Sequence, residues 1–283
     1  SLVVATNAPG TRERRLDAAR TRVHESLSGN TMGLFATYFN LTTLDWTLLA
    51  LSALLVGFAK TGISGASTLA IPIMAAIFGG KSSAGIMLPL LCVGDLFGVW
   101  FYNRHANWRF IARLLPWAGV GLAAGLVVGD MINDRQFKTI IALIVGSGLA
   151  LMLWQQSRKD KVQIPDAWWV GALLGLLGGF ATMIGNAAGP IMALYLLSMR
   201  LPKMEFIGTG AWFFLIINFI KLPLNAFVWD TITPMTLTLN ALFIPAIVTG
   251  AILGRYVVHI VPERSFRWLI VVSTFAASLK LVF

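Results

Sequence analysis

A lysine, three glycines and several hydroxyl groups stand together in the segment GFAKTGISGAS, residues 57–67. An ammonium group beside hydroxyl and backbone N–H donors is a combination that binds anions. The segment lies between two apolar stretches, WTLLALSALLV and TLAIPIMAAIF, so its polar groups are expected inside a membrane. The residues expected to bind the anion from this segment are Lys60, Thr61, Gly62, Ser64, Gly65 and Ser67.

A second segment of the same kind, GGFATMIGNAAGP, occupies residues 178–190. Glycine lets the backbone leave a helix, and proline is favoured where a new helix begins. The free N–H groups and the positive dipole end of a half-helix form an anion site. We therefore expect both broken helices to meet near the bilayer midplane. The second half of the chain is expected to contribute Gly185, Asn186, Gly189 and Asn218.

Two other interpretations of these segments remain open. Small residues let helices pack closely, which explains the glycines and alanines. This does not explain Lys60, because a cation inside the membrane is costly and usually functional. Lys60 could also extend to the membrane interface from the end of its helix.

Two further charged residues lie in apolar runs. Asp95 stands in LLCVGDLFGVW, and Lys221 stands in FFLIINFIKLPLNAF. Asp95 could carry a proton, pair with Lys60 or Lys221, or hold helices together. Pairing is favoured because an unpaired carboxylate is expensive at that depth. We assign Asp95 and Lys221 to coupling or to an ion pair.

No catalytic or metal-binding cluster is visible in the sequence. The three histidines are scattered, and the single cysteine, Cys92, lies in an apolar run. A membrane enzyme would need His, Asp, Glu or Cys residues gathered on one side. We therefore expect no enzyme activity, no cofactor and no metal.

The composition is that of a membrane protein. Of the 283 residues, 57% are hydrophobic and 12% are charged, against about 25% charged in soluble domains. Hydrocarbon admits only helices or closed barrels, and the apolar runs lack the alternation of barrel strands. We expect an all-α integral membrane protein whose partners are the lipid bilayer and a small anion. The net charge of +10 resides in short loops that orient the chain, so no nucleic acid is expected.

The apolar runs form ten segments. A full crossing needs about 20 residues, so the first, second, sixth and seventh segments are tilted or are half-helices. Eight and ten crossings both remain open. The segments are residues 44–60, 62–79, 84–102, 110–131, 136–154, 168–183, 186–200, 204–228, 235–259 and 265–283.

The two halves of the chain repeat each other. An offset of 123 residues aligns Asp95 with Asn218, and an offset of 129 aligns DRQFK with ERSFR. A six-residue insertion near the third segment of the second half reconciles the offsets. Duplicated halves are common in secondary transporters. The predicted parts are a polar tail with a possible interfacial helix (1–43), a first repeat (44–154), a linker (155–167) and a second repeat (168–283).

The loop charges favour inverted repeats. The loop after the third segment carries Arg104, Arg109 and Arg113, whereas the matching loop WDTITP has no basic residue. Basic loops face the cytoplasm, so equivalent loops would lie on opposite sides. An inverted arrangement also puts the arginine-bearing tail outside, which counts against it. A parallel arrangement with four crossings per half remains the alternative.

The chain resembles the TauE/SafE family of sulfite exporters and organosulfonate permeases. The resemblance lies in GFAKTGISGASTLAIPIM, in GGFATMIGNAAGPIMALYLL and in the DRQFK/ERSFR pair, and it runs from about Leu44 to Phe283. It implies secondary transport, by export, of sulfite or organosulfonates such as sulfoacetate across the bacterial inner membrane. An anion channel or a carrier of small carboxylates are the alternatives, and a homodimer remains open.

Overall fold

The computed structural model describes residues 39, 41–62, 66–141, 143, 144, 147, 167–199, 201–262 and 265. Every regular element among these residues is a helix, which confirms the predicted all-α fold. Of the predicted linker, residues 155–166 lie outside the described residues, as do residues 266–283 and the predicted tail except for Phe39 and residues 41–43. The helices are α2 (Thr43–Thr61), η1 (Ala66–Leu69), α3 (Ala70–Phe78), α4 (Gly80–Tyr102), η2 (Asn103–His105), α5 (Trp108–Met131), α7 (Trp168–Gly185), α8 (Gly189–Ser198), α9 (Lys203–Phe227), α10 (Pro234–Leu242) and α11 (Ile244–Ile260).

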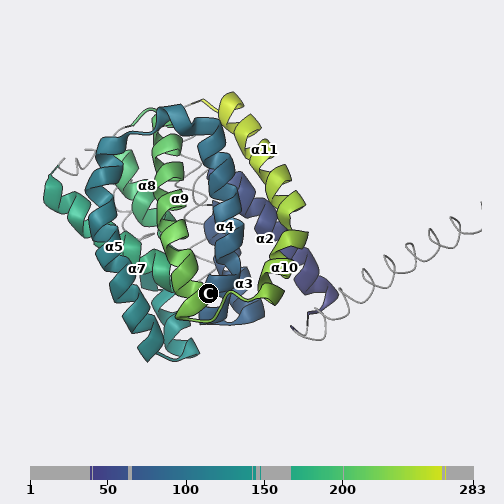
Figure 1. The fold of residues 1–283 in the computed structure, drawn as a ribbon. Coiled ribbons are helices and arrows are strands. Elements are labelled where there is room, and N and C mark those ends of the chain that lie inside the picture. Colours follow the sequence, from purple (N-terminus) through teal and green to yellow (C-terminus); the bar gives the residue numbers. More distant parts are fainter. Residues whose placement is uncertain are drawn as a thin grey trace, which may run out of the picture. The chain divides into compact units, whose positions relative to one another are not determined.

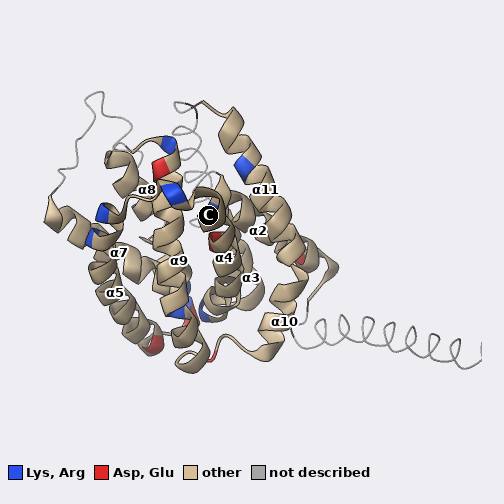
Figure 2. Cartoon of the chain, turned by 45° about the horizontal axis from the view of Figure 1, so that its top comes forward, with Lys and Arg blue, Asp and Glu red and all other residues tan. Residues whose placement is uncertain are grey.

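Five helices of the described chain are long and apolar enough to cross a membrane, namely α2, α4, α5, α7 and α9. The bent pair α10 and α11, which meet at 50°, would make a sixth span. Exposed tryptophans lie where α4 ends and where α5 and α7 begin, as in the aromatic belt of a membrane interface. Charged residues gather near helix ends, with few in the middle of the helices (Figure 2).

The chain divides into two units, residues 1–46 and 47–283, and all contacts described below lie within the second. In that unit α4 and α9 lie side by side, with α5 and α7 on one flank and α2, α10 and α11 on the other (Figure 1). Gly208, near the start of α9, lies beside Tyr102 at the end of α4. Gly85, near the start of α4, lies beside Asn225 near the end of α9. The two central helices therefore run antiparallel.

Glycines bring helices of the two halves into backbone contact in two matching places. In α5, Gly121 lies against the backbone of Leu176 and Phe180 in α7. In α11, Gly250 lies against the backbone of Leu54 and Phe58 in α2. Gly121 and Gly250 correspond at the predicted offset of 129. The packing thus fits a duplicated chain, and the inverted relation of the halves remains a prediction.

Gly121 offers a test of the close approach of α5 and α7. A Cβ atom there would run into the backbone of Leu176 and Phe180, which cannot give way as a side chain can. We expect Gly121→Ala to destabilise the protein by about 1–3 kcal/mol, as overpacking typically does. The matched control is Gly119→Ala, because a Cβ at Gly119 meets open space. Thermal unfolding in detergent compares the two, and equal melting temperatures would contradict the packing.

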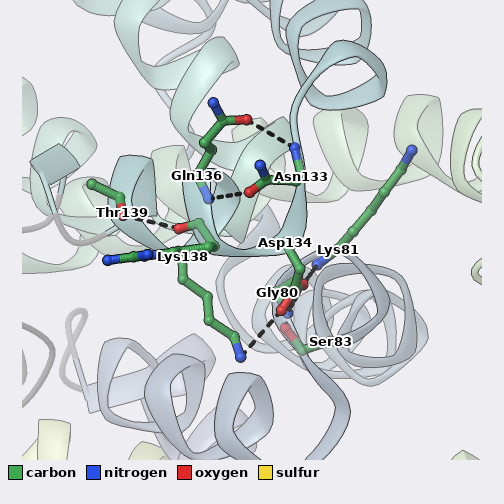
Figure 3. Close-up of polar contacts among 9 residues, drawn as sticks. Gly80, Lys81, Ser83, Asn133, Asp134, Gln136, Lys138 and Thr139 are labelled. Atoms are coloured by element: carbon green, nitrogen blue, oxygen red, sulfur yellow. Dashed lines mark hydrogen bonds and ion pairs between the residues drawn. The ribbon is translucent and has the colours of Figure 1, made fainter.

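The start of α4 is capped by a carboxylate at the start of the helical segment that follows α5 (Figure 3). Asp134 Oδ1 accepts hydrogen bonds from the backbone N–H groups of Gly80 (2.5 Å) and Lys81 (3.4 Å), and Lys138 Nζ lies 3.2 Å from Oδ2. Burial raises the pKa of Asp134, but the bonds from Lys138 and Gly80 outweigh this and hold the pKa below its usual value. The carboxylate thereby satisfies two of the free N–H groups at the start of α4 and complements the positive end of its dipole.

Candidate functional site

A cavity of about 40 Å³ lies between α2, η1, α4, α7, α8 and α9. Residues of both broken segments line it. Because about 10–15 Å³ of such volume holds one water molecule, the cavity has room for a few heavy atoms. Its polar lining consists of Lys60, Ser67, Thr182, Asn186 and Asn218, with Gly189 beside them.

Lys60, one residue before the end of α2, brings a positive charge to the cavity. Its Nζ lies 2.7 Å from Asp95 Oδ1, and its side chain is 11% exposed. The ammonium also lies 4.3 Å from the ring centroid of Phe214, close enough for a cation–π interaction. Lys60 therefore points between α4 and α9, rather than along α2 toward the membrane surface.

Asp95 joins the two central helices. It is completely buried in α4, and it does not line the cavity. Its Oδ1 pairs with Lys60, and its Oδ2 accepts a 2.6 Å hydrogen bond from Asn218 Nδ2 in α9. Asp95 and Asn218, which the repeat offset aligns with each other, are thus in direct contact.

Lys221 is a second buried cation, 1% exposed, one turn beyond Asn218. Its Nζ donates to Asn186 Oδ1 (2.5 Å), Thr182 Oγ1 (3.1 Å) and Asn218 Oδ1 (3.4 Å). Within the described part of the chain these hydrogen-bond partners are all neutral. With both lysines protonated, the cluster holds two ammonium groups and one carboxylate, a net positive charge at a depth where charge is expensive.

Asn186 connects the break after α7 to both central helices. It caps α7 in the left-handed conformation, with φ 56°, which asparagine adopts more readily than most residues. Its Nδ2 donates to the Ala84 carbonyl of α4 at 2.9 Å, and its Oδ1 accepts from Lys221 of α9. The break after α7 thus positions Asn186 between two helices and on the cavity wall.

The structure brings together five of the residues expected to bind substrate. Lys60, Ser67, Asn186, Gly189 and Asn218 all line the cavity. Ser64 and Gly65 lie outside the described residues. The role of each cavity residue in binding remains a prediction.

Three other expected residues serve helix packing and are not among those that line the cavity. The hydroxyl of Thr61 donates to the carbonyls of Ala251 (2.7 Å) and Gly57 (3.2 Å). Gly62 lies against Gly254, and Gly185 lies against the side chain of Ile141. Some small residues of these segments therefore pack helices together, and others line the cavity.

Among the cavity residues that the sequence did not single out, Thr182 and Phe214 contact the two buried lysines. Thr182, which binds Lys221, follows Lys60 by 122 residues, the spacing that relates Leu54 and Phe58 to Leu176 and Phe180. The offset of 123 found in the sequence aligns Lys60 with Met183, so the sequence repeat does not mark Thr182. Phe214 is one of many phenylalanines in apolar runs, and only its position under Lys60 marks it.

The described residues hold no group of three or more His, Cys, Asp or Glu side chains that could bind a metal ion. Chemistry at this site therefore rests on ammonium, carboxyl, amide and hydroxyl groups. Such a set can bind and release an anion and can hold a proton.

The family model described as "Sulfite exporter TauE/SafE" matches residues 48–281, which include every cavity residue. The comparisons with curated proteins and with solved structures each found no match. A match over most of the chain confirms the resemblance carried by the two glycine-rich segments. It also agrees with a multi-pass protein of the inner membrane, with which the long apolar helices are consistent. The chain belongs to the sulfite exporter TauE/SafE family, a family of membrane transporters.

Proposed function

We propose that this protein is a secondary transporter that exports sulfite through the cavity between the broken helices. The observation that carries the proposal is the charge of the buried cluster. Two ammonium groups, Lys60 and Lys221, face a single carboxylate, Asp95. A bound anion would supply the missing negative charge, as buried charges require.

The size and lining of the cavity support a small oxyanion. About 40 Å³ is room for a few heavy atoms, as in sulfite, and is tight for the longer sulfoacetate. Lys60, Ser67 and Asn218 offer N–H and O–H donors on the cavity wall. These groups match the oxygens of a sulfur oxyanion better than an extended organic chain.

The position of the cavity supports loading from the cytoplasm. Its walls run along α8 to Leu196 and along α9 from Asn218 back to Phe206, near the start of that helix. The same end of α9 lies beside η2, which carries Arg104 and leads to Arg109 at the start of α5, because Gly208 contacts His105. Basic loops face the cytoplasm, so a cavity that extends to this side would accept its substrate there and release it outside.

Flux into proteoliposomes tests the proposal directly. We expect saturable uptake of labelled sulfite, with sulfoacetate, taurine and acetate as competitors and with protein-free liposomes as the control for leakage. Strong competition by sulfoacetate would widen the substrate class to organosulfonates. Transport of acetate but not sulfite would identify a carboxylate carrier instead.

Saturation and counterflow separate a carrier from a channel. A carrier binds substrate on alternate sides, so unlabelled sulfite inside the vesicles should accelerate entry of labelled sulfite. Flux that rises in proportion to concentration, without acceleration by internal sulfite, would favour an anion channel over the proposed carrier.

A further inference from the structure

We infer that Asp95 takes up a proton when an anion binds Lys60, so that each anion crosses the membrane together with a proton. This inference rests on the proposed function and names its co-substrate. It follows from how the buried groups share partners.

Lys60 is the one residue of the ion pair that reaches the substrate. It lines the cavity, whereas Asp95 is 0% exposed and lies behind it. An anion that enters the cavity meets an ammonium whose charge is already satisfied by Asp95 Oδ1 at 2.7 Å. At the cavity wall, which Lys60 lines and Lys221 does not, binding therefore sets two negative groups, the carboxylate and the anion, against one ammonium.

The displaced carboxylate has few other sources of stabilisation. After the ammonium turns to the anion, Asp95 keeps the hydrogen bond from Asn218 Nδ2 at 2.6 Å. Lys221 lies beyond that amide, and it is engaged by Thr182 and Asn186. A buried charge that loses its partner is strongly unfavourable, and neutralisation removes the cost. A protonated Asp95 can still accept the hydrogen bond from Asn218.

The groups around Asp95 leave it as the site of proton uptake. The ionisable groups acting on it are Lys60 from α2 and Lys221 from α9, and Cys92 lies one turn earlier on α4. The neighbouring helices α3, α7 and α10 contain no ionisable residue. From α11, Arg255 lies against Phe101, six residues further along α4. Lys60 carries the charge that pairs with Asp95, and the nitrogen of Lys221 already contacts three side-chain oxygens, so we assign the proton to the carboxylate.

The exchange is balanced in atoms and charge. On the loading side one proton from water converts the Asp95 carboxylate to the acid while the anion binds Lys60. On the release side the anion leaves, the proton returns to water, and Lys60 and Asp95 pair again. A monoanion with one proton crosses without net charge, and a dianion with one proton carries one negative charge.

Isothermal titration of the detergent-solubilised protein with sulfite counts the protons. The heat is measured in buffers of different ionisation enthalpy, which gives the protons bound per sulfite. Sulfite itself can take up protons, so the count is read as the difference between the wild type and Asp95→Asn. We expect the wild type to take up about one proton more than the variant, as linkage between the two ligands requires. An equal count would overturn the inference, as would a folded variant that binds no sulfite.

A second measurement needs no variant. Wild-type proteoliposomes with a trapped pH dye are given an inward sulfite gradient at equal pH on both sides. The lumen should acidify in step with sulfite entry, beyond the change in protein-free liposomes and beyond the protons that the same amount of bisulfite would release on its own. Sulfite entry without added acidification would overturn the inference and leave the proposed function standing. No saturable sulfite entry at all would instead remove the proposed function.

Discussion

Replacing Lys60 with methionine is expected to reduce sulfite transport by about 100-fold, the loss of a charge-assisted contact worth about 3 kcal/mol. Lys60 is the ammonium that lines the cavity, so the anion loses its main counter-charge. The substitution also leaves the carboxylate of Asp95 buried without a cation, which costs about 3–5 kcal/mol of stability. Sulfite flux and thermal unfolding should therefore be measured together.

The double variant Lys60→Met with Asp95→Asn separates the two effects. It removes both charges of the ion pair, so stability should recover toward the wild-type value while transport stays as low as in Lys60→Met. If the double variant transports sulfite normally, Lys60 is a structural partner of Asp95 and does not bind substrate. The matched control is Lys81→Met, because Lys81 pairs with Asp130 at the start of α4 and does not line the cavity. It should keep full transport.

Lys60→Arg refines the expected result. Arginine keeps the positive charge but replaces a compact ammonium by a wide planar fork. The cavity is small, and the ammonium already lies over Phe214, so a guanidinium has little room. We expect transport between that of the wild type and that of Lys60→Met.

The main features of the fold could be predicted because the ends of membrane helices are visible in the sequence. The apolar runs end at charged or glycine-rich stretches, and the helices begin and end near the same residues. The breaks after α2 and α7 follow from Gly62 and Asn186, since a helix that ends inside hydrocarbon needs residues suited to leaving it. Asp95 and Lys60 could be recognised individually because each is costly where it stands.

The sequence did not predict which of the small residues pack helices together and which line the cavity. Thr61 and Ser67 are both hydroxyl residues of one segment, yet Thr61 bonds a carbonyl of α11 and Ser67 lines the cavity. The difference depends on α11 packing against Thr61, and the sequence around Thr61 does not indicate that contact. Phe214 was missed for the same reason, because an aromatic ring under an ammonium is a matter of tertiary contact.

Lys221 was correctly expected to be a buried charged residue, but its contacts were only partly predicted. Its position in an apolar run marks it as costly, and an ion pair with Asp95 was one of the interpretations. The structure places Asn218 between the two, since that amide donates to Asp95 and accepts from Lys221. The resulting chain of contacts runs from Lys60 in the first half to Asn186 in the second.

Lys221→Met is expected to weaken sulfite binding by about tenfold or more, equivalent to about 1.4 kcal/mol. Lys221 supplies the second positive charge of the cluster, and it holds Thr182 and Asn186 in place on the cavity wall. Without it the cluster contains one ammonium and one carboxylate, whose charges cancel. The net charge that favours an anion is then absent, although Lys60 remains.

Stability should respond to this substitution in the opposite way from Lys60→Met. Lys221 is buried, and its hydrogen-bond partners within the described chain are neutral, so removing its charge relieves a desolvation cost. The acceptors it leaves, Thr182 and Asn186, line the cavity, where water can satisfy them. We expect a melting temperature equal to or above that of the wild type, together with weaker binding by isothermal titration. A large fall in melting temperature with unchanged sulfite affinity would show instead that Lys221 holds the helices together, and that the charge attracting the anion belongs to Lys60 alone.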